Sequence, residues 1–90
     1  MSVTVEQIEM QLRNNLPVAA IEIQDDSAAH AGHAGAASGG GHFHVKITSL
    51  AFEGLGKVAR HRLVYDHLRG WMPHGIHALV IEARTPSERR

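Results

Sequence analysis

Residues 41–68, "GHFHVKITSLAFEGLGKVARHRLVYDHL", decide the fold, because the spacing of their hydrophobic side chains changes halfway along the segment. In the first part Phe43, Val45 and Ile47 alternate with polar residues, which is the pattern of a half-buried strand. The glycine-containing turn "FEGLG" then breaks this alternation. A strand is therefore followed, after a turn, by an element of different period that begins at Lys57.

Residues 57–68, "KVARHRLVYDHL", have the spacing of an amphipathic helix. Its predicted apolar face consists of Val58, His61, Val64, Tyr65 and Leu68. Charged residues fall largely outside this face: Arg60, Arg62, Asp66 and Arg69. Because His61 lies among apolar residues, we expect it to be a hydrogen-bonded core histidine that fixes the helix against the sheet.

A first helix is predicted near the start of the chain. Thr4 and Gln7 have the spacing of a capping box, in which two side chains satisfy backbone donors at a helix start. Apolar residues at three- and four-residue spacing follow, and Pro17 cannot continue the helix. We expect this helix to run from about Val5 to Leu16.

Two further strands complete the predicted fold. Ala19, Ile21 and Ile23 alternate with polar or small residues, and "HALVIEAR" (77–84) alternates again after the turn or short helix in "RGWMPHGI". A helical crossover before the last strand implies a parallel pairing. The order helix, strand, strand, helix, short helix, strand predicts one α+β domain over residues 1–90, with helices covering one face of a three-stranded mixed sheet.

The connection between the first two strands is unusual in composition. Residues 25–41, "DDSAAHAGHAGAASGGG", are rich in glycine and alanine, offer no apolar face and contain His30 and His33. We expect a long flexible loop at about residues 26–41, and long loops in small domains usually have a function or are disordered. His42 and His44 follow on the polar side of the next strand, where a solvated surface is the simpler interpretation.

The composition narrows the possible functions. Nine Lys and Arg balance nine Asp and Glu, so no overall charge attracts nucleic acid or an anionic membrane. The chain has no cysteine, which excludes disulfides and leaves histidine as its strong nitrogen ligand for metals. The sequence has no catalytic fingerprint, leader pattern or membrane span, and we expect a cytoplasmic protein that is not an enzyme.

Three stretches together resemble the BolA family: "DDSAAHAGH", then "GHFHVKITSLAFEGLGKVARHRLVYDHL", then "GIHALVIEARTP". The resemblance covers nearly the whole chain and implies a fold similar to class II KH domains. It implies a regulatory adaptor that often partners a monothiol glutaredoxin in handling a [2Fe-2S] cluster. In some bacterial members it implies a DNA-binding transcriptional regulator.

The resemblance also implies which residues bind the cluster. The histidine of the "HAL" motif is His77, and "DDSAAH" places the loop ligand at His30, with His33 three residues further on as an open alternative. Without the resemblance, His77 would be interpreted as a half-buried histidine at the rim of the sheet. Because the chain lacks thiolates, it can supply only the histidine side of a cluster, completed by a partner cysteine and glutathione. We expect no cofactor in the isolated chain, which should be a monomer or weak dimer.

The alternative function is DNA binding through the helix at 57–68 and the preceding "FEGLG" turn. Five basic residues would contact phosphates without reading bases: Lys46, Lys57, Arg60, Arg62 and Arg69. The only G-x-x-G sequence, "GHAG" at 32–35, lies in the strand–strand loop and not between helices. We therefore do not expect RNA recognition of the KH type.

Overall fold

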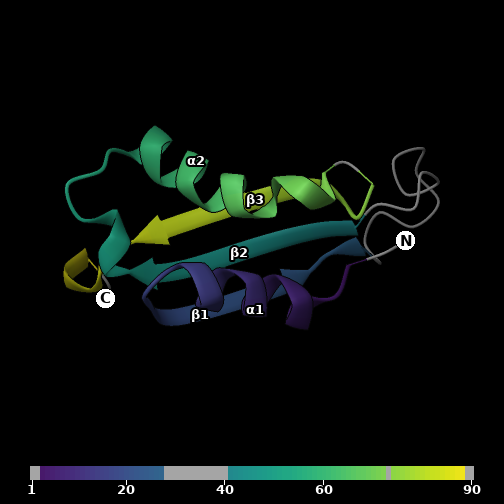
Figure 1. Ribbon diagram of the computed structural model, residues 1–90, viewed down its shortest axis with the longest axis horizontal. Coiled ribbons are helices and arrows are strands. Elements are labelled where there is room, and N and C mark those ends of the chain that lie inside the picture. Colours follow the sequence, from purple (N-terminus) through teal and green to yellow (C-terminus); the bar gives the residue numbers. More distant parts are fainter. Residues whose placement is uncertain (1–2, 28–40, 73, 89–90) are drawn as a thin grey trace.

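The computed structural model describes residues 3–27, 41–72 and 74–88, and it has the predicted α+β architecture (Figure 1). The main elements are α1 (Val5–Asn15), β1 (Val18–Asp25), β2 (Gly41–Ser49), α2 (Lys57–Leu68) and β3 (Ile76–Arg84). The described residues also form short 3-10 helices: η3 (Leu50–Phe52) between β2 and α2, η4 (Arg69–Trp71) after α2, and η5 (Pro86–Glu88) after β3. The sheet order is β1-β2-β3, with β1 antiparallel and β3 parallel to β2, which confirms the predicted mixed sheet.

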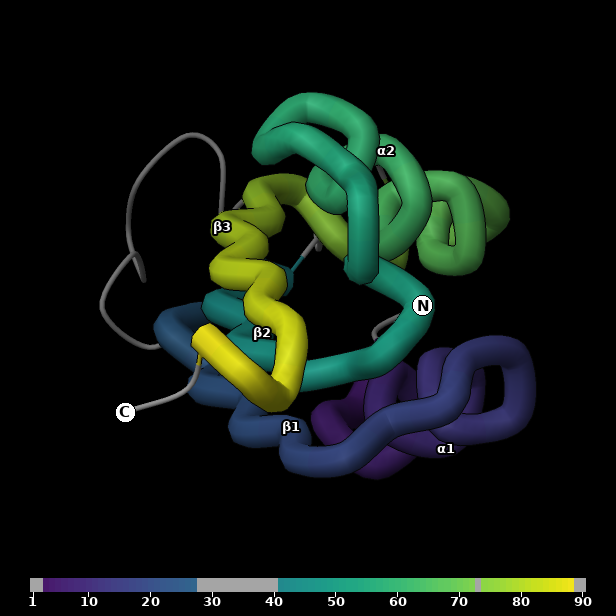
Figure 2. Tube along the Cα trace, turned by 90° about the vertical axis from the view of Figure 1, so that its left-hand side faces the viewer, coloured from purple at the N-terminus to yellow at the C-terminus, as the bar shows by residue number. Residues whose placement is uncertain are grey.

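Both long helices, α1 and α2, lie on the same side of the sheet, and no helix of the described residues covers the opposite face, called here the open face (Figure 2). The inward residues of β2 are Phe43, Val45 and Ile47, which are nearly or fully buried. They pack with residues of the two helices and the η3 turn: Ile8, Leu12, Phe52, Val64 and Leu68. A single aliphatic core with few aromatic rings therefore fixes the sheet against the helical layer.

The start of α1 follows from its capping box. Thr4 accepts a hydrogen bond from the Gln7 backbone at 3.1 Å, and the Gln7 side chain accepts one from the Thr4 backbone at 2.8 Å. The helix ends at Asn15, where Leu16 closes it with a backbone bond to Leu12 at 2.9 Å before Pro17. Its bounds agree with the prediction to within one residue.

The β1 strand departs from the predicted alternation at its start. The pairing of Val18 with Ser49 and of Ala20 with Thr48 leaves Ala19 as an extra residue in a β-bulge. Ala19 is exposed, whereas Ile21 and Ile23 are half-buried and pack against the core. The prediction that Ala19 shares a face with Ile21 and Ile23 is wrong, because the bulge shifts the side-chain parity.

The turn between β2 and α2 needs a glycine. Gly54 has a φ of 77°, a conformation that strongly disfavours residues with a Cβ. Ser49 supports the same turn, since its hydroxyl donates to the Pro17 carbonyl at 3.0 Å and accepts from the Ala51 backbone at 3.0 Å. Phe52 is completely buried beneath it. The "FEGLG" segment thus combines a buried aromatic ring with a glycine in the left-handed region.

The buried face of α2 differs from the predicted one. Val64 and Leu68 are completely buried, but Val58 is 71% exposed and His61 is exposed. The buried stripe follows the four-residue row of Arg60, Val64 and Leu68, and the row through Val58 and His61 lies beside it on the outside. The prediction that His61 is a core histidine is therefore wrong.

No helix in the described part of the chain is both long enough and apolar enough to cross a membrane.

Candidate functional site

A β-bulge at the start of β3 determines the position of His77. Gly41 pairs with Ile76 and His42 pairs with Ala78, so His77 is the extra residue between two paired positions. A bulge re-aims a side chain that regular pairing would turn elsewhere. His77 is exposed although it shares the strand parity of Leu79, which is half-buried against the core. Regular alternation would place His77 on the same face as Leu79, toward the core. The bulge explains why its imidazole is exposed instead.

Two histidine rings meet at this bulge. The His42 and His77 ring centroids lie 5.2 Å apart, with the ring planes tilted by 45°. His42 is half-buried, whereas His77 is exposed. The sequence placed His42 on a polar strand face, but it gave no sign that its ring lies beside His77, because the bulge brings them together.

The segment that contains the loop histidines begins and ends beside this pair. The His42 backbone donates to the Ser27 hydroxyl at 3.1 Å, and the His42 carbonyl accepts from the Asp26 backbone at 2.7 Å. The Gly41 backbone donates to the Gly75 carbonyl at 3.1 Å, which ties β2 to the residues before β3. Residues 28–40, with His30 and His33, lie outside the described residues. The flanking residues Ser27 and Gly41 lie beside the start of β3, because Gly41 pairs with Ile76 and Ser27 accepts a hydrogen bond from the His42 backbone.

His44 lies on the same face of β2 as His42, and its side chain has a carboxylate partner. Its Nε2 lies 2.5 Å from a carboxylate oxygen of Glu82, on the neighbouring strand. The hydrogen bond from His44 lowers the pKa of Glu82 below its ordinary value, and Lys46 and Arg84 act in the same direction. The alternation predicted for β2 is confirmed, but the solvated surface expected for His42 and His44 is not, because both are half-buried and Glu82 holds His44.

The described residues contain no group of three or more His, Cys, Asp or Glu side chains able to hold a metal ion. At the bulge they provide two imidazoles, and the chain has no cysteine. Two histidines can replace two cysteines on one iron of a [2Fe-2S] cluster, but the thiolates must then come from elsewhere. Of these residues, the exposed His77 suits one histidine position of a shared cluster, and the described residues cannot complete a cluster alone.

The five basic residues predicted for DNA binding do not share one surface. Lys46 is exposed on the open sheet face, where its cross-strand neighbours are Glu22 and Glu82. Lys57, Arg62 and Arg69 are exposed on or just after α2, on the covered side of the sheet. The sheet thus separates Lys46 from the predicted DNA-binding residues of α2, and two carboxylates flank Lys46.

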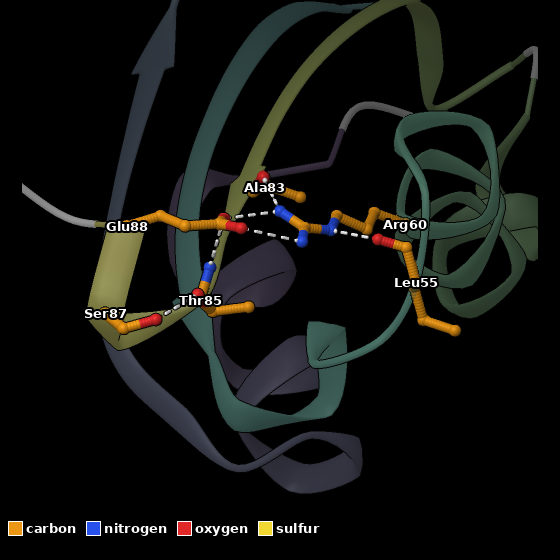
Figure 3. A network of polar contacts seen from close by, with 6 residues as sticks. All are labelled: Leu55, Arg60, Ala83, Thr85, Ser87 and Glu88. Carbon is orange, nitrogen blue, oxygen red and sulfur yellow. Dashed lines mark hydrogen bonds and ion pairs between the residues drawn. The ribbon is translucent and has the colours of Figure 1, made fainter.

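Arg60 is engaged in a polar network at the far end of β3 (Figure 3). Its guanidinium donates to the Glu88 carboxylate at 2.6 and 3.0 Å, and its Nε donates to the Leu55 carbonyl at 2.8 Å. Nη1 also donates to the Ala83 carbonyl at 3.4 Å, and the Thr85 backbone donates to Glu88 at 3.0 Å. These contacts make Arg60 a structural residue and not the phosphate-binding residue that the sequence predicted.

The same network changes the acid–base behaviour of its members. The hydrogen bond from Arg60, aided by that from the Thr85 backbone, lowers the pKa of Glu88 to about 2. The bond to Glu88 raises the pKa of Arg60 above its ordinary value. Only 16% of the Arg60 side chain is exposed, so its guanidinium lies mostly within the fold. The signal that could have identified this role is its spacing, four residues before Val64 on the buried row.

Comparison with known proteins identifies the family. The model of the family described as BolA-like protein matches residues 12–88. The chain is 47% identical over 81 residues to the chloroplastic protein BOLA1 of Arabidopsis thaliana, covering 87% of this chain and 51% of that protein. It is 42% identical over 86 residues to SufE-like protein 1, chloroplastic/mitochondrial, of the same plant, covering 90% of this chain and 23% of that one.

The chain therefore spans about half or less of the length of these two relatives. The solved structure of BolA1 from Arabidopsis thaliana is similar over 100% of both chains, with a TM-score of 0.81 and 38% sequence identity. The fold, the bulge-bearing "HAL" strand and the matched residues 12–88 lead to one conclusion: the chain belongs to the BolA family.

Proposed function

We propose that this protein is a BolA-like adaptor that binds a monothiol glutaredoxin and contributes histidine ligands to a shared [2Fe-2S] cluster. His77 would be one ligand, and His30 or His33 the other. The observation that carries the proposal is the exposed His77 imidazole at the bulge of β3, at the end of the sheet where residues 28–40 connect. In this role the chain is not an enzyme, and the cluster is its shared cargo.

The surroundings of His77 support its role as the dominant ligand. It lies on a hydrogen-bonded strand whose next residues, Leu79 and Ile81, pack against the core. A ligand fixed in this way loses little conformational entropy on binding. Neutral imidazole is a competent ligand for iron, and a partner cysteine with glutathione would supply the missing thiolates.

The decisive experiment is co-purification with a monothiol glutaredoxin and glutathione, followed by visible absorption and circular dichroism. We expect a complex whose spectrum differs from that of the glutaredoxin alone, and we expect His77→Ala to remove this difference. His44→Ala is the matched control, because His44 is on the same sheet but is held by Glu82. His74→Ala, an exposed histidine three residues before His77, is a second control.

Two outcomes would overturn this proposal. The first is the absence of any complex, with an unchanged glutaredoxin spectrum. The second is a His77→Ala protein that retains the wild-type spectrum while His44→Ala loses it, which would move the site to the polar face of β2. The individual and combined changes at His30 and His33 then decide which loop histidine participates, and we expect the double change to be the more severe.

We also propose a cytoplasmic location, which is one of the reducing compartments in which a glutathione-dependent partner can work. The two Arabidopsis relatives are named as chloroplastic or chloroplastic/mitochondrial proteins. Fractionation of cells that produce the protein tests the location, and recovery in an organelle would contradict it.

DNA binding is the second candidate, because Lys57, Arg62 and Arg69 are exposed at α2 and its end. It predicts an affinity that falls steeply with salt as counterions are released. The joint change Lys57→Ala and Arg62→Ala should weaken it, whereas Lys46→Ala, between two carboxylates, should have little effect. Arg60 is unsuitable as a test residue because it holds Glu88. Undetectable binding at low ionic strength would eliminate this candidate.

A further inference from the structure

We propose that His42 and His77 form a two-imidazole site for a divalent late transition-metal ion in the isolated chain. The site requires neither glutaredoxin nor a cluster, and His42 is a residue that the proposed function does not use. The ions that it would take are those that imidazole binds well, with Cu²⁺ the strongest, followed by Ni²⁺ and Zn²⁺.

The distance between the two rings suits a shared ion. The centroids lie 5.2 Å apart. Two imidazoles that bind one tetrahedral ion through nitrogens at ~2.0–2.1 Å have centroids about 5 Å apart. The observed spacing of the two rings therefore matches that of two imidazoles on one ion without movement of the strands.

The backbone holds both residues in place before an ion arrives. The His42 backbone is bonded on both sides, through its N–H to the Ser27 hydroxyl at 3.1 Å and through its carbonyl to the Asp26 backbone at 2.7 Å. His77 is fixed between the pairs Gly41–Ile76 and His42–Ala78. Ligands on paired strands lose little conformational entropy on binding, which favours metal binding by this pair.

The local charge favours a dication. The cross-strand neighbour of His42 on β3 is Ala78. On the other side, β1 ends at Asp25, opposite Phe43, and the backbone of the next residue, Asp26, donates to the His42 carbonyl. Lys46, the one cation within the β2 strand, lies four residues further along, next to Glu22 and Glu82. The two carboxylates raise the local concentration of cations without having to be ligands themselves.

His42 and His77 would each supply one imidazole nitrogen. Among the described residues, no third metal-binding side chain forms a group with them. The remaining coordination positions of the ion are then left for water or an added chelator. The appropriate probe is the copper complex of iminodiacetate, which leaves positions on Cu²⁺ for two imidazoles. Because the test uses the isolated chain, its failure would leave the proposed glutaredoxin adaptor unaffected.

The experiment is a titration of the tag-free chain with Cu²⁺–iminodiacetate, followed by calorimetry and by electron paramagnetic resonance. We expect one complex whose resonance shows coupling to two imidazole nitrogens. His42→Ala and His77→Ala should each weaken binding by at least about tenfold, as loss of a supporting metal contact commonly does. His44→Ala should bind as the wild type does, since Glu82 holds that ring outside the pair.

His42→Phe separates ligation from packing, since it keeps a ring in the half-buried position but removes the nitrogens. It should fold, as judged by far-ultraviolet circular dichroism, and still bind about tenfold more weakly or worse. The double change of His30 and His33 to alanine should leave binding by the pair intact. Wild-type affinity in His42→Phe, or loss of binding in the His30 and His33 double variant alone, would overturn the proposal.

Discussion

The two ends of the β2–β3 pair differ in how they use their polar side chains. Because these strands are parallel, their starts meet at one end and their final residues at the other. We call the first the histidine end, formed by Ser27, Gly41, His42, Gly75 and His77. We call the second the arginine end, formed by Leu55, Arg60, Ala83, Thr85 and Glu88.

At the arginine end the charged groups satisfy one another. Arg60 bonds two carbonyls and both oxygens of Glu88, and Glu88 also accepts from the Thr85 backbone. At the histidine end the backbone is bonded as thoroughly, but the bulge leaves the His77 side chain exposed. The arginine end therefore uses its side chains for the fold, and the histidine end keeps an imidazole available for binding.

The largest loss of stability should come from a change in the core beneath the arginine end. Phe52→Ala should lower the free energy of unfolding by about 3–5 kcal/mol, the usual cost of deleting a buried aromatic ring. Leu50→Ala is the matched control in the same 3-10 helix, where Leu50 is 62% exposed, and it should cost less than about 0.5 kcal/mol. Urea denaturation measures both, and equal losses would contradict the account of this end.

At the histidine end the corresponding weak point is a glycine. A Cβ on Gly41 would lie 2.5 Å from Cε2 of the Phe43 ring, which is itself buried. Gly41→Ala must displace that ring, and overpacking of this kind costs about 1–3 kcal/mol. Gly70→Ala, which meets nothing within 4 Å, should change the stability by less than about 0.5 kcal/mol. If Gly41→Ala left the free energy of unfolding unchanged, the strand would be able to shift at this end without loss of stability.

The sequence predicted the arginine and histidine ends unequally. The capping box of Thr4 and the strand alternation around Val45 were enough to predict these elements of the fold, and both signals depend on spacing within a few residues. The choice of His77 as a ligand came from the family resemblance and stays a prediction. Local spacing is the information that a single sequence carries most clearly.

What the sequence did not predict depends on contacts between distant segments. The pair of His42 with His77 requires a register shift between β2 and β3, and no local pattern marks which strand pair carries a bulge. The role of Arg60 depends on Glu88, which is 28 residues away. The prediction for His61 failed because two adjacent rows of α2 fit the apolar spacing about equally well, and only packing against the sheet selects one.

The pH dependence of stability tests the charge pairing at the arginine end. The pKa of Glu88 is about 2, below the ordinary 4.5, so its ionised form stabilises the fold at any pH above about 4.5. This contribution falls between pH 4.5 and about 2 and is absent below that range. Glu88→Gln lacks it, so the stability difference between wild type and variant should be constant above pH 5 and shrink on acidification.

We expect this effect to be smaller than the loss of the Phe52 ring, because 47% of the Glu88 side chain is exposed and water screens the pair. Arg60→Ala serves as the partner variant, since it removes the main donor to Glu88 and should reduce the same pH dependence, leaving the smaller part due to the Thr85 backbone. Thermal unfolding across the acid range measures the differences. A wild-type-like acid profile in Glu88→Gln would mean that the pair does not stabilise the arginine end.

The smallest effect on stability should come from the residue with the largest proposed effect on function. His77 is exposed, and its ring contacts His42 at the surface, so His77→Ala should change the free energy of unfolding by less than about 0.5 kcal/mol. The same variant should lose the spectrum of the shared cluster when combined with a monothiol glutaredoxin and glutathione. Denaturation of the isolated chain and absorption of the complex measure these two quantities separately. If His77→Ala instead destabilised the chain as strongly as Gly41→Ala, the imidazole would be part of the fold, and the histidine end would resemble the arginine end.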